Sequence, residues 1–343
     1  NIRQIRIDSE DIIKGELIGD FRFEEFLLLA QNALGSMYSN YNPFDIAPDQ
    51  FLKFDFIIYN QIVDVFFPEI SVAPNTRIKG DIKANENQLK LKISSPKITA
   101  YGNIIDSLSL NTNNKRKLYD TSLSAKSIET PYYKLSNLLL FNKTINDTLF
   151  FKSAFKGGLS EKEVFNLDFY FTINKEKKSV IGIEKSTFNY RGNLWDLNPK
   201  NNTENKLVFD LKKDEYVFST FKLKSIEQEI NFKGVVIDST YKKIEIDFTN
   251  VYLKSFLPEI DSLKLRGKLN GTINVSQKDG VYGPKGNLKV KNFEINDFKQ
   301  GNLFLNVEGD SSYDKYQVIL SLEREKVKSI SALGTLNFSE KRP

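Results

Sequence analysis

Cysteine and histidine are both absent from the 343 residues, and methionine and tryptophan occur once each. Without a thiol or an imidazole, the chain has no Cys-His or Ser-His-Asp nucleophile, none of the usual zinc sites, and no haem or iron–sulfur ligation through these residues. Disulfides are excluded as well. The lack of cysteine is compatible with an oxidising periplasm but does not establish one. We therefore expect a non-enzymatic protein with no catalytic residue, metal or cofactor.

The sequence also lacks a long hydrophobic run. No stretch approaches the ~18–20 apolar residues of a membrane-spanning helix, and the longest candidate, "FEEFLLLAQNALGSMY" at 23–38, is interrupted by acidic and amide side chains. The chain opens on "NIRQIRID", which already alternates like a strand, and shows neither an initiator methionine nor a signal peptide. We interpret it as a segment of a longer protein whose targeting signal is not included.

The sequence also lacks a large excess of charge of one sign. The 49 basic and 44 acidic residues are spread along the chain and leave a net charge of +5. Near-balanced charges of this kind indicate ordinary solubility, and we expect no nucleic-acid partner.

What the sequence does contain is period-two alternation, in a chain with 27 Phe and 15 Tyr. In "LKLRGKLNGTINVSQ" at 263–277, every odd position from Leu263 to Val275 is apolar or glycine, and every even position between them is polar. Such a pattern is typical of a strand with one apolar face. It lasts about twice as long as an ordinary strand and recurs down the chain between short polar breaks. Hairpin-length gaps predict largely antiparallel pairing.

The predicted fold is therefore mostly β: an elongated, curled, largely antiparallel sheet that forms an open hydrophobic groove. One short amphipathic helix is expected at about 24–38, and a weaker one near 62–67 that ends at Pro68. No linker divides the chain, so we expect one continuous body over 1–343 with a helix-containing cap or plug at 20–42. Packing of this helix against a sheet edge is favoured over a plug of the groove.

Two parts of the sequence resemble the repeats of the TamB and AsmA-like translocation and assembly module family. The run "LRGKLNGTINV…GPKGNLKVKNFEINDFKQGNLFLNVEG" has a Leu-x-Gly-x-Leu-x-Gly strand, a short hairpin, Gly-x-Leu-x-Val and an aspartate-bearing turn. "STFNYRGNLWDLNP" and "STFKLKSIEQEINFKGVV" are similar to the inward half of such a repeat in the Bacteroidetes members. The resemblance is clearest over 70–110 and 185–340. The family's membrane anchor and carboxy-terminal docking module are not seen, as in a middle segment.

The resemblance implies a bridge-like lipid transfer architecture in the periplasm of a Gram-negative bacterium. The protein would be held at the inner membrane by an anchor outside this segment, and it would feed an outer-membrane barrel of the Omp85 family, similar to TamA. Phospholipid or another acyl lipid would be the cargo, and support of outer-membrane biogenesis and protein assembly the role.

In physical terms, acyl chains would fill the trough in place of a second sheet, with about 0.8 kcal/mol gained per buried CH₂. Seven glycines are expected on the apolar side, where they would permit the curl or relieve crowding at bulges: Gly80, Gly102, Gly192, Gly234, Gly267, Gly271 and Gly334. Sixteen residues are predicted to line the groove: Ile82, Leu91, Phe151, Phe169, Phe171, Phe188, Phe209, Phe232, Ile246, Phe248, Leu265, Leu269, Ile273, Val290, Leu305 and Leu320.

Two alternatives remain open at this point. An outer-membrane β-barrel shows the same alternation, although the charged polar face of the strands and the helix at 24–38 disfavour it. A cell-surface β-sandwich adhesin or carbohydrate-binding module would bury the same aromatic residues in a dry core. The pair Tyr132–Tyr133 is the one aromatic platform that the sequence offers such a module.

Overall fold

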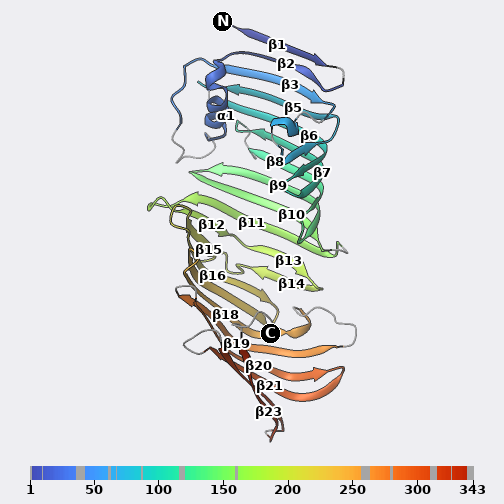
Figure 1. The fold of residues 1–343 in the computed structure, drawn as a ribbon, viewed down its shortest axis with the longest axis vertical. Helices are drawn as coiled ribbons and strands as arrows, with labels where there is room; N and C mark the ends of the chain where they lie inside the picture. The colour runs from blue at the N-terminus through green and yellow to red at the C-terminus, as the bar shows by residue number, and fades with distance from the viewer. Residues whose placement is uncertain are drawn as a thin grey trace. The chain divides into compact units, whose positions relative to one another are not determined.

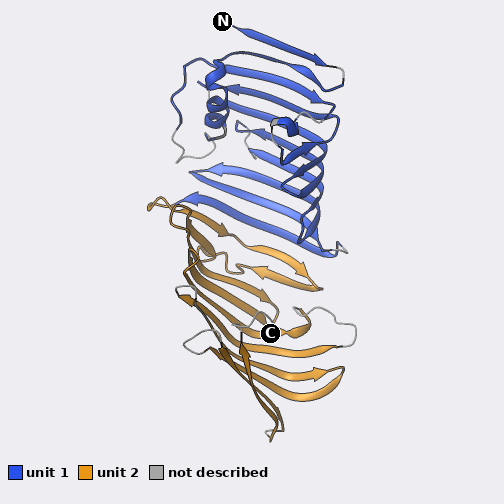
Figure 2. Cartoon of the chain, viewed as in Figure 1, with its two compact units in different colours: residues 1–173 blue, residues 174–343 orange. Residues whose placement is uncertain are grey.

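The computed structural model describes residues 2–9, 11–35, 43–60, 63–66, 68–85, 88–115, 120–158, 161–255, 263–278, 281–309, 315–325 and 327–337. These residues form 23 strands, two short α-helices and two 3₁₀ turns, and every strand pair whose register is resolved is antiparallel. The mostly-β, antiparallel fold class is thus confirmed. The chain divides into two compact units, residues 1–173 and 174–343 (Figure 2). Within the described residues, no helix is both long and apolar enough to cross a membrane.

Unit 1 (residues 1–173) is an antiparallel sheet in the order β1-β2-β3-β5-β6-β7-β8-β9-β10-β11 (Figure 1). Short β4 pairs with the last residues of β6, and β5 pairs with its first half. The strands are β1 Arg3–Ser9, β2 Ile13–Asp20, β3 Phe51–Ile58, β4 Ile70–Val72, β5 Thr76–Lys83, β6 Gln88–Ala100, β7 Asn103–Asn113, β8 Thr121–Glu129, β9 Lys134–Ile145, β10 Thr148–Gly157 and β11 Glu163–Ile173.

Unit 2 (residues 174–343) is a meander from β15 to β23, in which each strand pairs with the next. At its start β16 is shared, because β15 pairs with its first half and β14 with its end. The strands are β12 Ser179–Ile183, β13 Ser186–Tyr190, β14 Asn193–Leu197, β15 Lys206–Asp210, β16 Glu215–Ser225, β17 Gln228–Ile237, β18 Tyr241–Tyr252, β19 Leu265–Lys278, β20 Val281–Ile295, β21 Phe298–Gly309, β22 Lys315–Arg324 and β23 Val327–Asn337.

A line of irregular positions crosses β6 to β9 of unit 1. The flanking pairs Ser95–Leu108 and Lys97–Asp106 leave Pro96 opposite Ser107, and the same pattern continues through β8 to Asn137. Ser107 and Asn137 have φ values of 52° and 53°. Along this line the apolar side chains are spaced by three residues instead of two. Because a bulge bends and twists its strand, we infer that the sheet of unit 1 bends here.

Unit 2 contains comparable bulges with a recurrent hydrogen bond. The register shifts between Phe248 and Val251 on β18 and again within β20. At the first bulge Asn250 has a φ of 50°, and its backbone N–H donates to Oδ1 of Asn270 at 3.0 Å. Asn292 on β20 repeats the arrangement, with its N–H donating to Oδ1 of Asn302 at 3.3 Å. At each of these bulges, an asparagine of the neighbouring strand therefore accepts a hydrogen bond from a backbone N–H that has no partner in the strand pairing.

Helix α1 (Phe26–Gly35) follows a 3₁₀ turn at Phe23–Glu25 and packs on the apolar face of unit 1. Leu29 and Ala33, one turn apart, bury against Leu52 of β3 and Ile82 of β5. The predicted packing of this helix against a sheet edge is therefore wrong, because its apolar stripe packs on the apolar face of the sheet. Residues 36–38 of the predicted helix lie outside the described residues. The weaker helix is present as α2, Val63–Phe66, and Ile62 and Phe67 are not described.

The segment 43–50 fastens this helix to the sheet. The Asn32 side chain pairs with the backbone of Phe44, accepting from its N–H at 2.8 Å and donating to its carbonyl at 2.9 Å. Glu25 accepts hydrogen bonds from the Ala47 N–H at 2.9 Å and from the Gln50 side chain at 2.7 Å. The Ala47 hydrogen bond is the main reason that the pKa of Glu25 is lowered.

Two segments that alternate like single strands are in fact hairpins, so the expected placement of Gly102 and Gly192 on the apolar side of a strand is wrong. Residues 98–104 alternate as one strand would, but Tyr101–Gly102 is the turn between β6 and β7, and Gly102 has a φ of 74°. Gly192 likewise sits in the turn between β13 and β14, with a φ of 75°. These two glycines therefore serve tight turns and do not lie on the apolar face.

Truncation of Leu29 tests the packing of the helix on the sheet. Leu29 is 1% exposed, whereas Leu27 on the same helix is 65% exposed. We expect Leu29→Ala to lower the free energy of unfolding by about 2–5 kcal/mol through loss of buried contacts and the cavity left behind. Leu27→Ala should change it by less than about 0.5 kcal/mol. Urea denaturation of both variants checks this, and equal effects would show that α1 does not pack as described.

Candidate functional site

The apolar face of unit 2 is built from three continuous rows of cross-strand neighbours. Residues directly opposite one another on paired strands share a face, so each row can be followed from strand to strand. The rows are Phe232–Ile246–Ile273–Gly286–Val307–Val318; Ile230–Phe248–Gly271–Leu288–Leu305–Leu320; and Val251–Leu269–Val290–Leu303–Leu322. Leu265 lies on this face next to Ile295. Phe209 lies opposite Tyr216, two residues from Phe218, which is opposite Gly234.

Unit 1 has an apolar face of the same kind. One row runs across nine strands: Leu17–Phe54–Gly80–Leu91–Thr112–Thr121–Asn142–Phe151–Phe169. Ile82 and Phe171 flank it on β5 and β11. The structure therefore places all the predicted lining residues of unit 1 on one face. The three polar members of the row, which alternation alone does not reveal, interrupt that face at β7 to β9.

Most of these lining residues are half-buried. Of the sixteen predicted, Ile82 and Val290 are buried, at 4% and 6% exposure, and the other fourteen are intermediate. Neighbouring side chains of the same sheet shield them sideways, and aromatic pairs contribute to this. Phe151 stacks on Phe169 with ring centroids 4.9 Å apart, and Phe218 meets Phe232 edge-on at 5.2 Å. Such pairs add about 0.5–1.5 kcal/mol each beyond their buried area.

Three closed clusters interrupt the half-buried surface. In unit 1, helix α1 covers Ile82 and its neighbour Leu89, so Ile82 does not line an open trough. In unit 2, Trp195 of β14 is 1% exposed and packs with Ile230 and Val251. A third cluster joins Val290 to Phe293 and Leu322. Protein side chains thus seal the face at these points. The sequence indicated a helix-containing cap or plug at 20–42 but neither of the two clusters in unit 2.

The opposite face of each sheet is polar and carries cross-strand ion pairs. In unit 1, Arg77 makes a two-pronged contact with Asp55, through Nε at 2.8 Å and an Nη at 2.7 Å, and Lys79 reaches the same carboxylate at 2.9 Å. Mainly through the hydrogen bonds from Arg77, the pKa of Asp55 falls from 3.8 to about 2. In unit 2, Lys233 pairs with Glu245 at 2.6 Å, which raises the pKa of Lys233. These charged side chains make this face of each sheet the one that contacts water.

Glycines on the apolar face make room for neighbouring groups. A Cβ on Gly80 would lie 2.2 Å from the ring of Phe54, and one on Gly271 would lie 2.0 Å from the backbone oxygen of Asn287. Gly271 also has a φ of 120°, which side chains rarely adopt. Close approach of neighbouring groups, as expected for a bent sheet, therefore accounts for both positions.

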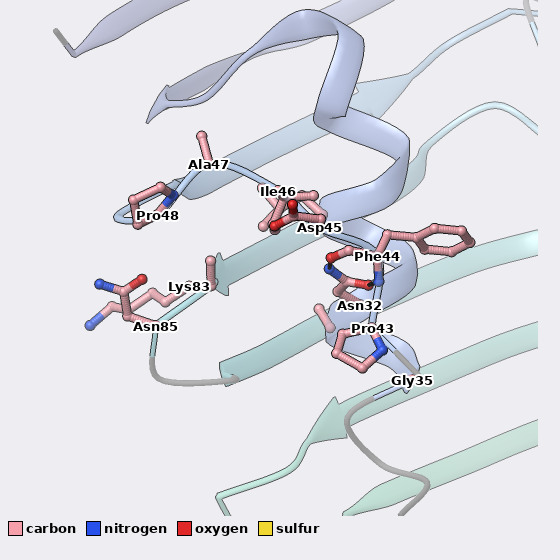
Figure 3. Close-up of a pocket in the computed structure, with 13 residues that line it drawn as sticks. Asn32, Gly35, Pro43, Phe44, Asp45, Ile46, Ala47, Pro48, Lys83 and Asn85 are labelled. Carbon is pink, nitrogen blue, oxygen red and sulfur yellow. Dashed lines mark hydrogen bonds between the residues drawn. The ribbon is translucent and has the colours of Figure 1, made fainter. Parts of the chain in front are cut away.

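A cavity of about 400 Å³ lies beside helix α1, between the segment 43–48 and the end of β5 (Figure 3). Its walls include Asn32, Lys83 and Asn85, and Asn85 is hydrogen-bonded to Asp49. Figure 3 shows the ring of Phe44 pointing away from this space. The amide groups are largely engaged in holding the segment to the helix, so we assign the cavity to the attachment of α1 and not to a ligand.

Residues that could carry other chemistry are not gathered. Among the described residues, no group of three or more acidic side chains could hold a metal ion. In the predicted aromatic platform, Tyr132 is 96% exposed, but the Tyr133 hydroxyl donates to Glu163 at 2.8 Å. The Tyr133 ring is therefore held by a hydrogen bond while the Tyr132 ring is almost fully exposed, so this turn does not present the predicted two-ring platform.

Comparison with protein-family models, with curated proteins and with solved structures finds no match to this chain. The membership in the TamB and AsmA-like family that the repeats suggested therefore stays a prediction.

The Asp55 ion pairs predict a specific acid sensitivity. Because the pKa of Asp55 is lowered by folding, its contribution to stability is present above about pH 4 and is lost as the pH falls towards 2. The shift alone corresponds to roughly 2 kcal/mol, and partial solvent exposure reduces this to about 1 kcal/mol. Urea denaturation from pH 2 to 6 should show Asp55→Asn less stable than the wild type above pH 4, with the two curves converging near pH 2. Parallel curves would contradict the assignment.

Proposed function

We propose that the protein shields lipid acyl chains on the apolar faces of its two sheets. One observation carries this proposal: in unit 2, the row of apolar side chains from Phe232 to Val318 and the row from Phe248 to Leu320 remain half-buried over β17 to β22. Water contact with so much hydrocarbon surface is unfavourable by about 25 cal/mol per Å². Soluble proteins that leave such a surface uncovered use it to bind a partner or a ligand.

An acyl chain suits this surface better than a folded protein does. The rows run across the strands, so a chain lying along them meets apolar side chains from one strand after the next. Each CH₂ that it buries gains about 0.8 kcal/mol. No hydrogen-bonding group is needed on the lining, which agrees with rows built almost wholly from Phe, Leu, Ile, Val and Gly. The polar face and the strand ends leave a headgroup in water.

The cellular role follows from the sequence resemblance. As a TamB-like segment the protein would act in the periplasm, as part of a conduit from the inner to the outer membrane, with phospholipid as cargo and an Omp85-family barrel as partner. It would support outer-membrane biogenesis without catalysing a reaction. The sandwich alternative predicts instead that a second protein layer covers the same rows.

A charge on the apolar face tests the proposal. Leu305 lies between Leu288 and Leu320, and its neighbour Asn306 points to the polar face. We expect Leu305→Asp to reduce the lipid that co-purifies with the protein at least tenfold, because a difference of about 1.4 kcal/mol in affinity already gives that factor. Asn306→Asp, which adds the same charge on the other face, should retain the co-purifying lipid. Mass spectrometry of extracted lipid, per mole of protein, is the measurement.

A third variant separates a ligand-binding surface from an ordinary core. Val290 is 6% exposed within a closed cluster, so Val290→Asp should unfold unit 2, because a buried unpaired charge is strongly destabilising. Leu305→Asp should keep the near-UV circular dichroism of the wild type. Should Leu305→Asp unfold as Val290→Asp does, Leu305 belongs to a protein core and the proposal fails.

A further inference from the structure

Five connections between strands lie on the same side of unit 2, where the strands end. In an antiparallel meander alternate turns fall on the same side, which places the turns after β16, β18, β20 and β22 together. The β13–β14 turn joins them, because Asp196 pairs with Lys224 and the start of β14 therefore extends past the end of β16. We call the described residues in and beside these five connections the unit 2 rim.

An exposed apolar side chain lies in or beside every connection of the unit 2 rim. The exposed fractions are 61% for Leu194, 94% for Ile226, 37% for Leu263, 72% for Phe298 and 67% for Val327. Alternate turns of a sheet are separated by about 10 Å, so these side chains form a line of separate tips and not one continuous patch. A single exposed apolar side chain is common on protein surfaces; what distinguishes these five is that they recur at regular intervals along one side of the sheet.

Ile226 shows that the turn itself does not select these residues. It is the first of the two residues between β16 and β17, and its φ is 51°. A β-branched residue in this left-handed region is a genuine outlier. The two-residue turn between β20 and β21 uses Asn296 and Asp297, which tolerate it. An isoleucine that is both strained and 94% exposed contributes neither to the turn nor to a core.

Basic residues accompany the apolar tips. Seven exposed examples lie at or beside the five connections: Arg191, Lys224, Lys254, Lys264, Lys299, Arg324 and Lys328. Three acidic residues lie in the described parts of these connections: Glu227 is paired with Lys268 at 2.7 Å, Asp297 is paired with Arg266 at 2.5 Å, and Glu325 is exposed. The exposed basic residues therefore outnumber the exposed acidic ones along the rim. Apolar tips flanked by Lys and Arg are the combination by which proteins bind the interface of anionic membranes.

We propose that the unit 2 rim docks on the surface of an anionic lipid bilayer, with the apolar tips entering the interface and the basic residues contacting the headgroups. A fluid bilayer accepts separate tips about 10 Å apart without matched pockets, which a protein partner would have to supply. This docking does not require an acyl chain on the apolar face. The inference therefore goes beyond the acyl-chain proposal, and the two can fail separately.

Co-sedimentation of the full chain with vesicles tests the proposal. We expect binding to vesicles of phosphatidylglycerol and phosphatidylcholine in equal parts, at least tenfold weaker binding to pure phosphatidylcholine, and a further decrease as salt is raised. The double variant Ile226→Asn, Phe298→Ser should bind the mixed vesicles at least tenfold less. The matched control Leu211→Ser removes a 69% exposed side chain from the opposite edge and should bind like the wild type.

Thermal unfolding gives a readout that a purely structural role would not produce. Because Ile226→Asn relieves a left-handed isoleucine, its midpoint should be equal to or above that of the wild type while vesicle binding falls. The proposal is overturned if the double variant binds the mixed vesicles as the wild type does. It is equally overturned if the wild type self-associates in sedimentation velocity and the double variant does not, which would assign the unit 2 rim to an interface between copies. Co-purifying lipid, measured on the same samples, reports on the acyl-chain proposal alone.

Discussion

Cross-strand register is the constraint on which the rest of this structure depends. A slip of one residue would move every side chain of a strand to the other face. The correct pairing must therefore bring apolar residues together on one face and polar residues together on the other. In unit 2, Phe232 faces Ile246 on the apolar side while the next pair, Lys233 and Glu245, forms an ion pair at 2.6 Å on the polar side. A slip of one residue would expose the first pair and bury the second, and a slip of two would keep the faces but separate the partners of the ion pair. Alternation and the cross-strand ion pairs therefore favour this pairing without a second layer to enforce it.

The same constraint explains why the irregular positions are shared between strands. A bulge on one strand alone would shift its apolar side chains relative to both neighbours. On β6 to β9 the irregularity occurs on all four strands at matched positions, so Ile105 and Ile128 still pair beyond it just as Leu110 and Leu123 do before it. The sheet of unit 1 can thus bend while its strands stay in register on both sides of the bend.

The sequence predicted those features that depend on local alternation. Residues 263–277 correspond closely to β19, Leu265–Lys278, and all five lining residues predicted in unit 1 share one face. The error at 98–104 has a physical cause: a two-residue turn keeps the apolar residues in step, so alternation alone cannot distinguish Tyr101–Gly102 from the interior of a strand. The seals by α1 and by Trp195 depend on contacts between residues far apart in the chain. Helical spacing indicated an amphipathic helix at 24–38 but not the residues that it covers, and no spacing rule could have indicated the seal by Trp195.

These seals also bear on what the remaining apolar face can do. Where helix α1 lies on unit 1, the residues beneath it, such as Leu52 and Ile82, are 0% and 4% exposed. A protein layer can therefore cover this kind of face fully, and a sandwich would repeat that cover along the sheet. Over β17 to β21 the same chemistry recurs at Phe232, Ile273 and Leu305 with only intermediate burial. Side chains that pack well under a cover in unit 1 and stay half-buried in unit 2 are consistent with a removable cover there, such as the acyl chains proposed above, which a fixed protein layer would not provide.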